Sequence, residues 1–219
     1  MNADHERANF IISNTRLVAV PLTREIVLHI ADDVTTLWQM TEDELKESGL
    51  PPPFWAFAWA GGQALARYVL DNPEIVRGKR VLDFAAGSGL VGIAAALAGA
   101  AHVEACDIDA FAISSVGVNA RANRVTIDAK ASDLVGVDEN WDVVLAGDVS
   151  YERDMAARVT HWLGVLSGRG ANVLIGDPGR TYLTKDRLVE LAEYVTPVSR
   201  DLEDTDVKMA KVWRVVGSE

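Results

Sequence analysis

Short unbroken apolar runs alternate along this chain with stretches whose apolar residues recur every three or four positions. Unbroken runs are typical of buried strands, and the wider spacing is typical of amphipathic helices. The runs predict strands at 80–84, 102–106, 124–129, 142–147 and 171–176. Helical spacing and helix formers predict helices at 90–98, 109–121, 152–163 and 185–194, and another that follows Gly61 and Gly62 and ends at Asp71. This order indicates an α/β fold with a mostly parallel sheet and helices on both faces.

The end of the chain carries two further β-runs, at about 195–202 and 207–216, with a polar turn at 203–206 between them. A hairpin makes its two strands antiparallel. We therefore expect seven strands in one sheet, of which the last runs against its neighbours.

The first 53 residues read as an extension that packs on a main domain at 54–219. Two β-runs at 16–20 and 25–30 predict a hairpin, and a capping box of Thr41 and Glu44 predicts a short helix at 42–48. The first ten residues contain acids and no apolar core, so we expect neither a secretory signal nor a transit peptide. The location that we expect is a bacterial cytoplasm.

The charge and composition of the chain limit which kinds of molecule it is expected to bind. The net charge of −11 disfavours nucleic acid, and small molecules or lysine-rich protein surfaces fit better. No apolar run reaches the roughly 18 residues that span a membrane. The single cysteine, Cys106, and the four histidines lie far apart without ligand spacing, so no metal site is expected.

The stretch VLDFAAGSGLVGIAAAL at 81–97 combines a strand end, a glycine turn and a helix start, which together form a nucleotide cradle. Gly87, Gly89 and Gly92 satisfy the dinucleotide spacing G-x-G-x-x-G, which alone is a weak signal. Asp83, just before the turn, would repel a pyrophosphate but attract a ligand that carries a sulfonium and an ammonium.

At this stretch the chain resembles the class I methyltransferases that depend on S-adenosylmethionine, whose first motif is an acid followed by glycines at alternate positions. Ala85 stands where the first glycine usually is. The resemblance implies S-adenosylmethionine as cofactor and a Rossmann-like methyltransferase fold, with a mostly parallel seven-stranded sheet and an antiparallel last strand.

Asp107 lies twenty residues after Gly87, the spacing of a carboxylate that binds both ribose hydroxyls. Both NAD and S-adenosylmethionine carry that ribose, so Asp107 supports a nucleotide without choosing between them. Asp133 could accept a hydrogen bond from an adenine amino group, or could be an exposed loop acid. The full set assigned to the cofactor is Trp59, Gly61, Asp83, Ala85, Gly87, Gly89, Asp107, Ile108, Asp133, Leu134 and Gly147.

In WDVVLAGDVSYERDM at 141–155 an apolar strand ends at Gly147 and is followed by Asp148 and Tyr151. An acid, two residues and an aromatic resemble the post-strand motif of methyltransferases that modify lysines of non-histone proteins. The resemblance extends to PFWAFAWAGGQAL at 53–65 and GDPGR at 176–180. It implies catalytic roles for Asp148 and Tyr151, substrate roles for Phe54, Trp55, Asp177 and Arg180, and the β subunit of electron transfer flavoprotein as protein substrate.

The same residues also have purely structural interpretations, and the chain has alternative functions. Asp148 could simply cap the next helix, and the aromatic residues at 54–59 could form a core cluster. The chain could methylate another protein or a small molecule, could be an NAD-binding oxidoreductase or sensor, or could bind the cofactor without turnover.

Overall fold

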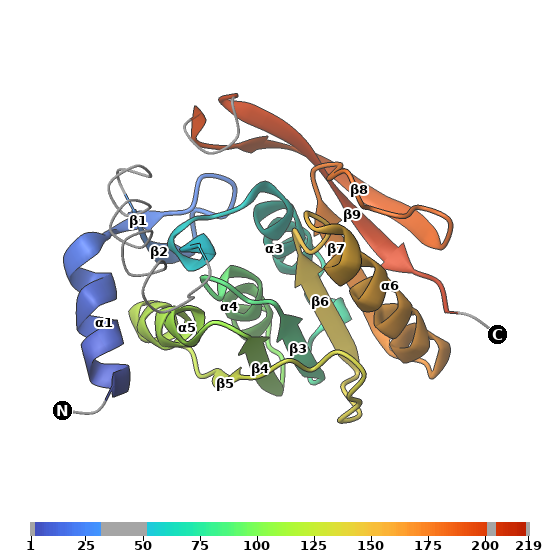
Figure 1. The fold of residues 1–219 in the computed structure, drawn as a ribbon, viewed down its shortest axis with the longest axis horizontal. Helices are drawn as coiled ribbons and strands as arrows, with labels where there is room; N and C mark the ends of the chain where they lie inside the picture. The colour runs from blue at the N-terminus through green and yellow to red at the C-terminus, as the bar shows by residue number, and fades with distance from the viewer. Residues whose placement is uncertain (1–2, 32–51, 201–204, 218–219) are drawn as a thin grey trace.

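A computed structural model describes residues 3–31, 52–200 and 205–217 of the chain. Its centre is a seven-stranded sheet in the order β5-β4-β3-β6-β7-β9-β8 (Figure 1). The strands are β3 (Arg80–Phe84), β4 (His102–Asp107), β5 (Asp128–Ala131), β6 (Val143–Gly147), β7 (Asn172–Asp177), β8 (Leu188–Pro197) and β9 (Val207–Val215). Because β9 alone runs against β7 and β8, the predicted mostly parallel sheet with an antiparallel last strand is confirmed.

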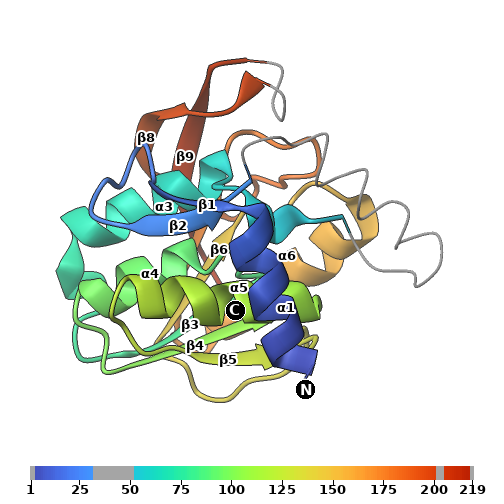
Figure 2. The same ribbon diagram turned by 90° about the vertical axis from the view of Figure 1, so that its left-hand side faces the viewer.

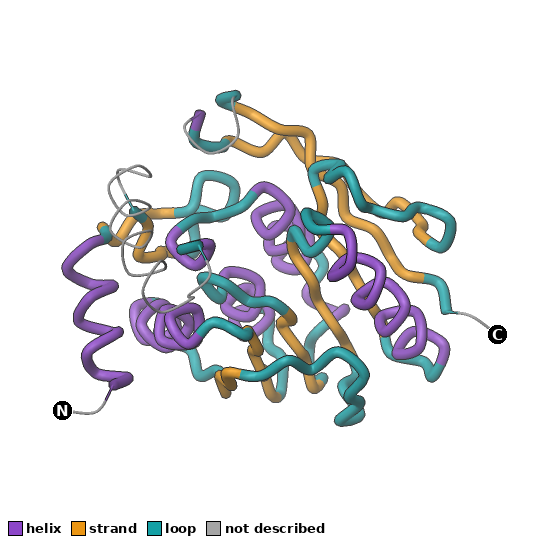
Figure 3. The backbone as a smooth tube through the Cα atoms, in the orientation of Figure 1, coloured by secondary structure: helices purple, strands orange, loops and turns teal. Residues whose placement is uncertain are grey.

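Helices cover both faces of the sheet, as predicted (Figures 1 and 3). One face is covered by α3 (Ala60–Asp71), α4 (Leu90–Leu97) and α5 (Ala110–Ala122), and the other by α6 (Arg153–Gly168). Two short 3-10 turns, η1 (Phe54–Ala56) and η2 (Pro73–Ile75), flank α3. The central strands β3, β6 and β7 are buried on both faces, which explains why their sequences read as unbroken apolar runs.

The helix predicted at 185–194 is wrong, because this segment forms most of β8. Leu188, Leu191 and Val195 recur at helical spacing, but the pairing of β8 with β9 slips between Glu190 and Ala192. Such a bulge shifts the alternation of inward and outward side chains by one residue. A strand with this shift imitates a helical period.

The described part of the N-terminal extension contains α1 (Ala3–Asn14), β1 (Arg16–Ala19) and β2 (Val27–Ile30). The predicted hairpin is confirmed by the antiparallel pairing of β1 with β2, whereas the helix predicted at 42–48 lies outside the described residues. The sequence did not predict α1, which packs across α5 (Figure 2). Its apolar contact is small, consisting mainly of buried Ile11 and of Phe10, whose ring meets Phe111 edge-on.

Two asparagines of α5 attach the hairpin to the main fold. The side-chain amide of Asn123 accepts a hydrogen bond from the Val27 N–H at 3.0 Å and donates one to the Val27 carbonyl at 2.7 Å. Asn119 accepts from the His29 N–H and donates to the Ser88 carbonyl in the glycine turn. The extension is therefore linked through Asn119 to the turn between β3 and α4.

Candidate active site

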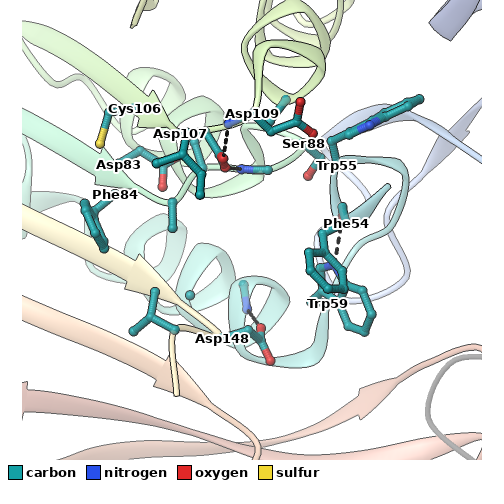
Figure 4. Close-up of a pocket in the computed structure, with 18 of the residues that line it drawn as sticks. Phe54, Trp55, Trp59, Asp83, Phe84, Ser88, Cys106, Asp107, Asp109 and Asp148 are labelled. Carbon is teal, nitrogen blue, oxygen red and sulfur yellow. Dashed lines mark hydrogen bonds between the residues drawn. The ribbon is translucent and has the colours of Figure 1, made fainter. Parts of the chain in front are cut away.

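A cavity of about 470 Å³ opens at the carboxyl ends of β3, β4 and β6 (Figure 4). Ligands of α/β sheets bind at this edge, and the volume is within the usual range for a cofactor site. Of the residues assigned to cofactor, catalysis or substrate, the following line it: Phe54, Trp55, Trp59, Asp83, Ala85, Gly87, Asp107, Ile108, Asp133, Gly147, Asp148, Tyr151 and Arg180. Gly61, Gly89, Leu134 and Asp177 are not among its lining residues.

The turn from β3 into α4 needs left-handed backbone at three positions. Ala85, Gly87 and Gly89 have φ values of 53°, 51° and 79°, a region that glycine enters without steric cost. A Cβ on Gly89 would also lie 3.2 Å from the side chain of Val116. Gly89 therefore shapes the turn from outside the cavity, where the turn packs against Val116 of α5.

Asp83 lies beneath this turn, almost fully buried (Figure 4). Its Oδ2 accepts a hydrogen bond from the Gly92 N–H at 2.7 Å, in the first turn of α4. Burial raises the pKa of Asp83 to about 8, because it penalises the charged form more than the Gly92 bond stabilises it. A cationic ligand in the cavity would favour the ionised form of Asp83, and the attraction between the two charges would strengthen binding of the ligand.

Asp107, at the end of β4, organises the rim of the cavity. Its Oδ2 accepts from the Gly87 N–H and its Oδ1 from the Asp109 N–H, both at 3.0 Å. Each oxygen keeps a second lone pair that a ribose hydroxyl can use. Asp109 is the N-cap of α5, because its carboxylate accepts the Phe111 N–H at 2.8 Å.

The two neighbouring loops differ in what they present to the cavity. Ile108 is 73% exposed at the rim, and Asp133 pairs with Arg158 of α6 at 3.1 Å. The side chain of Leu134 packs in the core instead. Arg158 lines the cavity but was missed in the sequence, since an arginine on an amphipathic helix carries no signal of its own.

Aromatic side chains from 54–59 form one wall of the cavity (Figure 4). Trp59 donates its indole N–H to the Phe54 carbonyl at 2.8 Å, which closes the segment into a loop. The ring of Trp55 stacks on Phe111 with centroids 5.9 Å apart, beside the turn that carries Asp109. Trp55 thus lies on the side of the cavity next to Asp107 and Asp109. The ring of Phe54 lies beside that of Tyr151, with the two ring centroids 5.4 Å apart.

Asp148 follows β6 in a left-handed conformation with φ of 54°. Strain of this kind gathers at functional sites. Its Oδ2 accepts the Gly62 N–H of α3 at 2.8 Å, and its Oδ1 accepts from Arg180 at 3.0 Å. Burial raises the pKa of Asp148 to about 6, while the charge of Arg180 opposes that rise. Asp148 does not cap the next helix, because Glu152 is the N-cap of α6.

Glycines allow α3 to approach the strand ends that carry Asp148. A Cβ on Gly61 would lie 2.2 Å from the Gly176 carbonyl oxygen and 2.6 Å from Oδ2 of Asp148. A Cβ on Gly147 would lie 2.9 Å from the Gly62 Cα. Only glycine fits these positions, so Gly61 places the Gly62 amide against Asp148 without lining the cavity itself.

Arg180 reaches the cavity from the turn after β7. Asp177 sets this turn, because its Oδ1 accepts the N–H groups of Gly179 and Arg180, both at 2.7 Å. The guanidinium lies 5.6 Å from the centre of the Trp59 ring, over its face. Asp177 therefore positions Arg180 from outside the cavity.

These residues fit S-adenosylmethionine. The cavity has a carboxylate for the ribose in Asp107, a buried acid for a cationic centre in Asp83, and a glycine turn where a ligand can approach backbone amides. Among the described residues it offers no arginine or lysine at the glycine turn for a pyrophosphate, since the two arginines that line it pair with Asp133 and Asp148.

Comparison with known proteins agrees with this chemistry. Over 214 residues the chain is 36% identical to the electron transfer flavoprotein β-subunit lysine methyltransferase of Danio rerio, covering 94% of this chain and 82% of that protein. It is 34% identical to the human protein of that name, covering 96% and 82%, and 32% identical to the Caenorhabditis elegans homologue, covering 95% of both. The chain belongs to this methyltransferase family. Residues 63–149 also match the family model of ribosomal protein L11 methyltransferase (PrmA).

Solved structures share the fold. Magnesium protoporphyrin IX methyltransferase from Synechocystis PCC 6803 with bound S-adenosylmethionine superposes with a TM-score of 0.52, at 15% identity over 86% of this chain and 85% of that one. Its complex with S-adenosylhomocysteine gives 0.53, at 14% identity over 99% and 95%. The methyl donor of this family member is S-adenosylmethionine, as the sequence predicted.

Two structural observations bear on other partners. No helix among the described residues is long and apolar enough to cross a membrane. Within the same residues, no group of three or more histidine, cysteine or acidic side chains is arranged to hold a metal ion.

Proposed function

We propose that this enzyme methylates lysine side chains of the electron transfer flavoprotein β subunit. The observation that carries the proposal is Asp148, a buried carboxylate on the cavity wall with lone pairs left for an incoming amine. Tyr151, half-exposed at the opening, offers an aromatic flank for an aliphatic lysine chain. The names of the relatives supply the target protein.

The chemistry needs a neutral lysine amine, because only the lone pair can attack a methyl group. At a reference pKa near 10.4, about one lysine in a thousand is neutral at pH 7.4, which costs roughly 4 kcal/mol. When bound, S-adenosylmethionine supplies the activated methyl and a positive sulfur.

The chain's own residues hold and orient the amine. Asp148 accepts one amine N–H through an oxygen already fixed by Gly62 or Arg180, which directs the nitrogen lone pair into the cavity. Phe54 and Tyr151 flank the lysine stem and exclude water from it. Positioning of this kind accounts for much of the rate in transfers that form no covalent enzyme intermediate.

Transfer of labelled methyl to purified electron transfer flavoprotein tests the proposal, with mass spectrometry to locate the modified residue. The informative variant is Asp148→Asn, since asparagine tolerates left-handed backbone and retains an oxygen for the Gly62 N–H. It removes the negative charge and puts an NH2 group where the carboxylate accepts from Arg180. We expect labelled lysine on the β subunit with the wild type, and a loss of at least about 100-fold in the variant.

Calorimetry with S-adenosylhomocysteine shows whether the variant retains its nucleotide site. Wild-type rates in a folded Asp148→Asn protein would remove the role of Asp148. An active wild type that labels a different protein in a cell extract would keep the reaction and replace the target, and nicotinamide binding with no methyl transfer would favour the oxidoreductase alternative.

A further inference from the structure

Arg180 joins three parts of the site at one point. Its Nη2 donates to Oδ1 of Asp148 at 3.0 Å, its guanidinium covers the Trp59 ring at 5.6 Å, and its backbone N–H is held by Asp177. The side chain is largely buried. An arginine fixed in this way contributes both a rigid contact and a permanent positive charge.

The positive charge of Arg180 lies close to the site of the target amine, because both Arg180 and the amine are hydrogen-bonded to Asp148. The other ionisable groups facing this part of the site come from neighbouring elements: Asp177 ends β7, Tyr151 and Glu152 precede α6, Asp107 ends β4 and Asp83 lies in β3. All of these are acids, and the loop at 52–59 contributes none. Arg158 of α6 also lines the cavity but pairs with Asp133, so Arg180 is the cation that contacts Asp148 directly.

An uncompensated carboxylate would be harmful here. It would stabilise the ammonium form of the target lysine, which cannot react, and so would raise the cost of losing the proton. With Arg180 in place, Asp148 still accepts a hydrogen bond but presents little net charge to the amine.

We propose that Arg180 is a positioning residue that fixes the Asp148 carboxylate and whose positive charge keeps the bound target amine neutral. This inference rests on the proposed lysine methylation. It makes Arg180 part of the acid-base chemistry, although Arg180 itself transfers no proton.

The test compares Arg180→Met with Arg180→Lys. Methionine keeps an unbranched stem without charge, while lysine keeps the charge but not the guanidinium. Single-turnover rates with saturating enzyme and S-adenosylmethionine report the bound amine, from about pH 6.5 to about pH 9.5. In Arg180→Met the rise of rate with pH should move about one unit upward, a loss of about tenfold near pH 7 that largely recovers at high pH.

The same variant should bind substrate with an unchanged or lower KM, because the ammonium form is then better stabilised. Arg180→Lys should retain the wild-type pH dependence at a reduced rate. Arg200→Met, which removes an exposed arginine paired with Asp206 on the β8–β9 hairpin, is the matched control and should leave the profile unchanged.

The outcomes separate cleanly. If both Arg180 variants lose the same factor at every pH, Arg180 only holds Asp148 in place and the electrostatic role is refuted. If the wild type transfers no methyl to any lysine, the proposed function fails and the inference fails with it. A shifted profile in Arg180→Met together with an unshifted one in Arg180→Lys supports both.

Discussion

Ala85 occupies a backbone conformation that suits it poorly. Its φ of 53° lies in the left-handed region, which costs a residue with a Cβ about 1–2 kcal/mol relative to glycine. The family motif places glycine at this point, and the structure gives the reason. The alanine keeps the turn small enough for a ligand but leaves it strained.

Replacing Ala85 with glycine should therefore raise the free energy of unfolding by about 0.5–1 kcal/mol, after allowance for the more flexible unfolded chain. Urea unfolding measures the change. Ala157→Gly is the matched control, since Ala157 is exposed on the helix α6 and the same exchange there should destabilise by about 1 kcal/mol. A destabilised Ala85→Gly would mean that the turn is not strained.

At the scale of elements, the N-terminal hairpin depends on α5 for the backbone hydrogen bonds of β2. Asn123→Ala removes a donor and an acceptor from Val27 at once, so we expect a loss of about 1–2 kcal/mol in the free energy of unfolding. In the Asn123→Ala variant, the backbone amides of residues 16–30 should exchange hydrogen faster than those of β3. Asn9→Ala, on the exposed side of α1, should change neither quantity, and equal effects of both substitutions would contradict this attachment.

The elements also mark what sequence patterns can predict. β3, β6 and β7 were predicted closely because strands buried on both faces must be continuously apolar. The segment 188–197 was misread because a bulge changes the spacing of its inward-facing side chains. The helix α1 was missed because it has few apolar residues, and one of them, Phe10, packs on Phe111 from a distant part of the sequence.

The sequence likewise predicted some residues of the site and missed others. Asp107 and Asp148 could be found because acids directly after buried strands must lie at one edge of the sheet. The packing of Gly61 against Gly176 and the pairing of Arg158 with Asp133 could not be found. These contacts join segments whose approach is fixed by tertiary packing, which no local pattern records.

At the scale of the whole molecule, several acids are buried around one cavity. Burial raises the pKa of Asp83 to about 8 and of Asp109 and Asp148 to about 6, and it raises those of Asp107 and Asp177 as well. Between the unfolded value near 3.8 and these pKa values, the folded protein binds more protons than the unfolded chain. Its stability should therefore fall as pH rises through this window.

The free energy of unfolding without ligand should accordingly decrease from about pH 5 to about pH 8, and Asp83→Asn should flatten the upper part of that decline. Chemical denaturation at several pH values measures both. The same variant should bind S-adenosylmethionine more weakly, because its neutral amide no longer attracts a cation. Asp186→Asn, an exposed acid, is the control, and an unchanged slope in Asp83→Asn would show that Asp83 does not titrate in this range.

The aromatic wall gives the enzyme an optical reporter of its own. Of the five tryptophans in the part of the chain that the structure describes, Trp55 and Trp59 line the cavity, whereas Trp141, Trp162 and Trp213 are buried away from it. An adenine ring or a sulfonium that comes within contact distance of an indole changes its emission, because both interact with the aromatic face. Cofactor occupancy can thus be followed by intrinsic fluorescence in solution, without a label and without waiting for turnover.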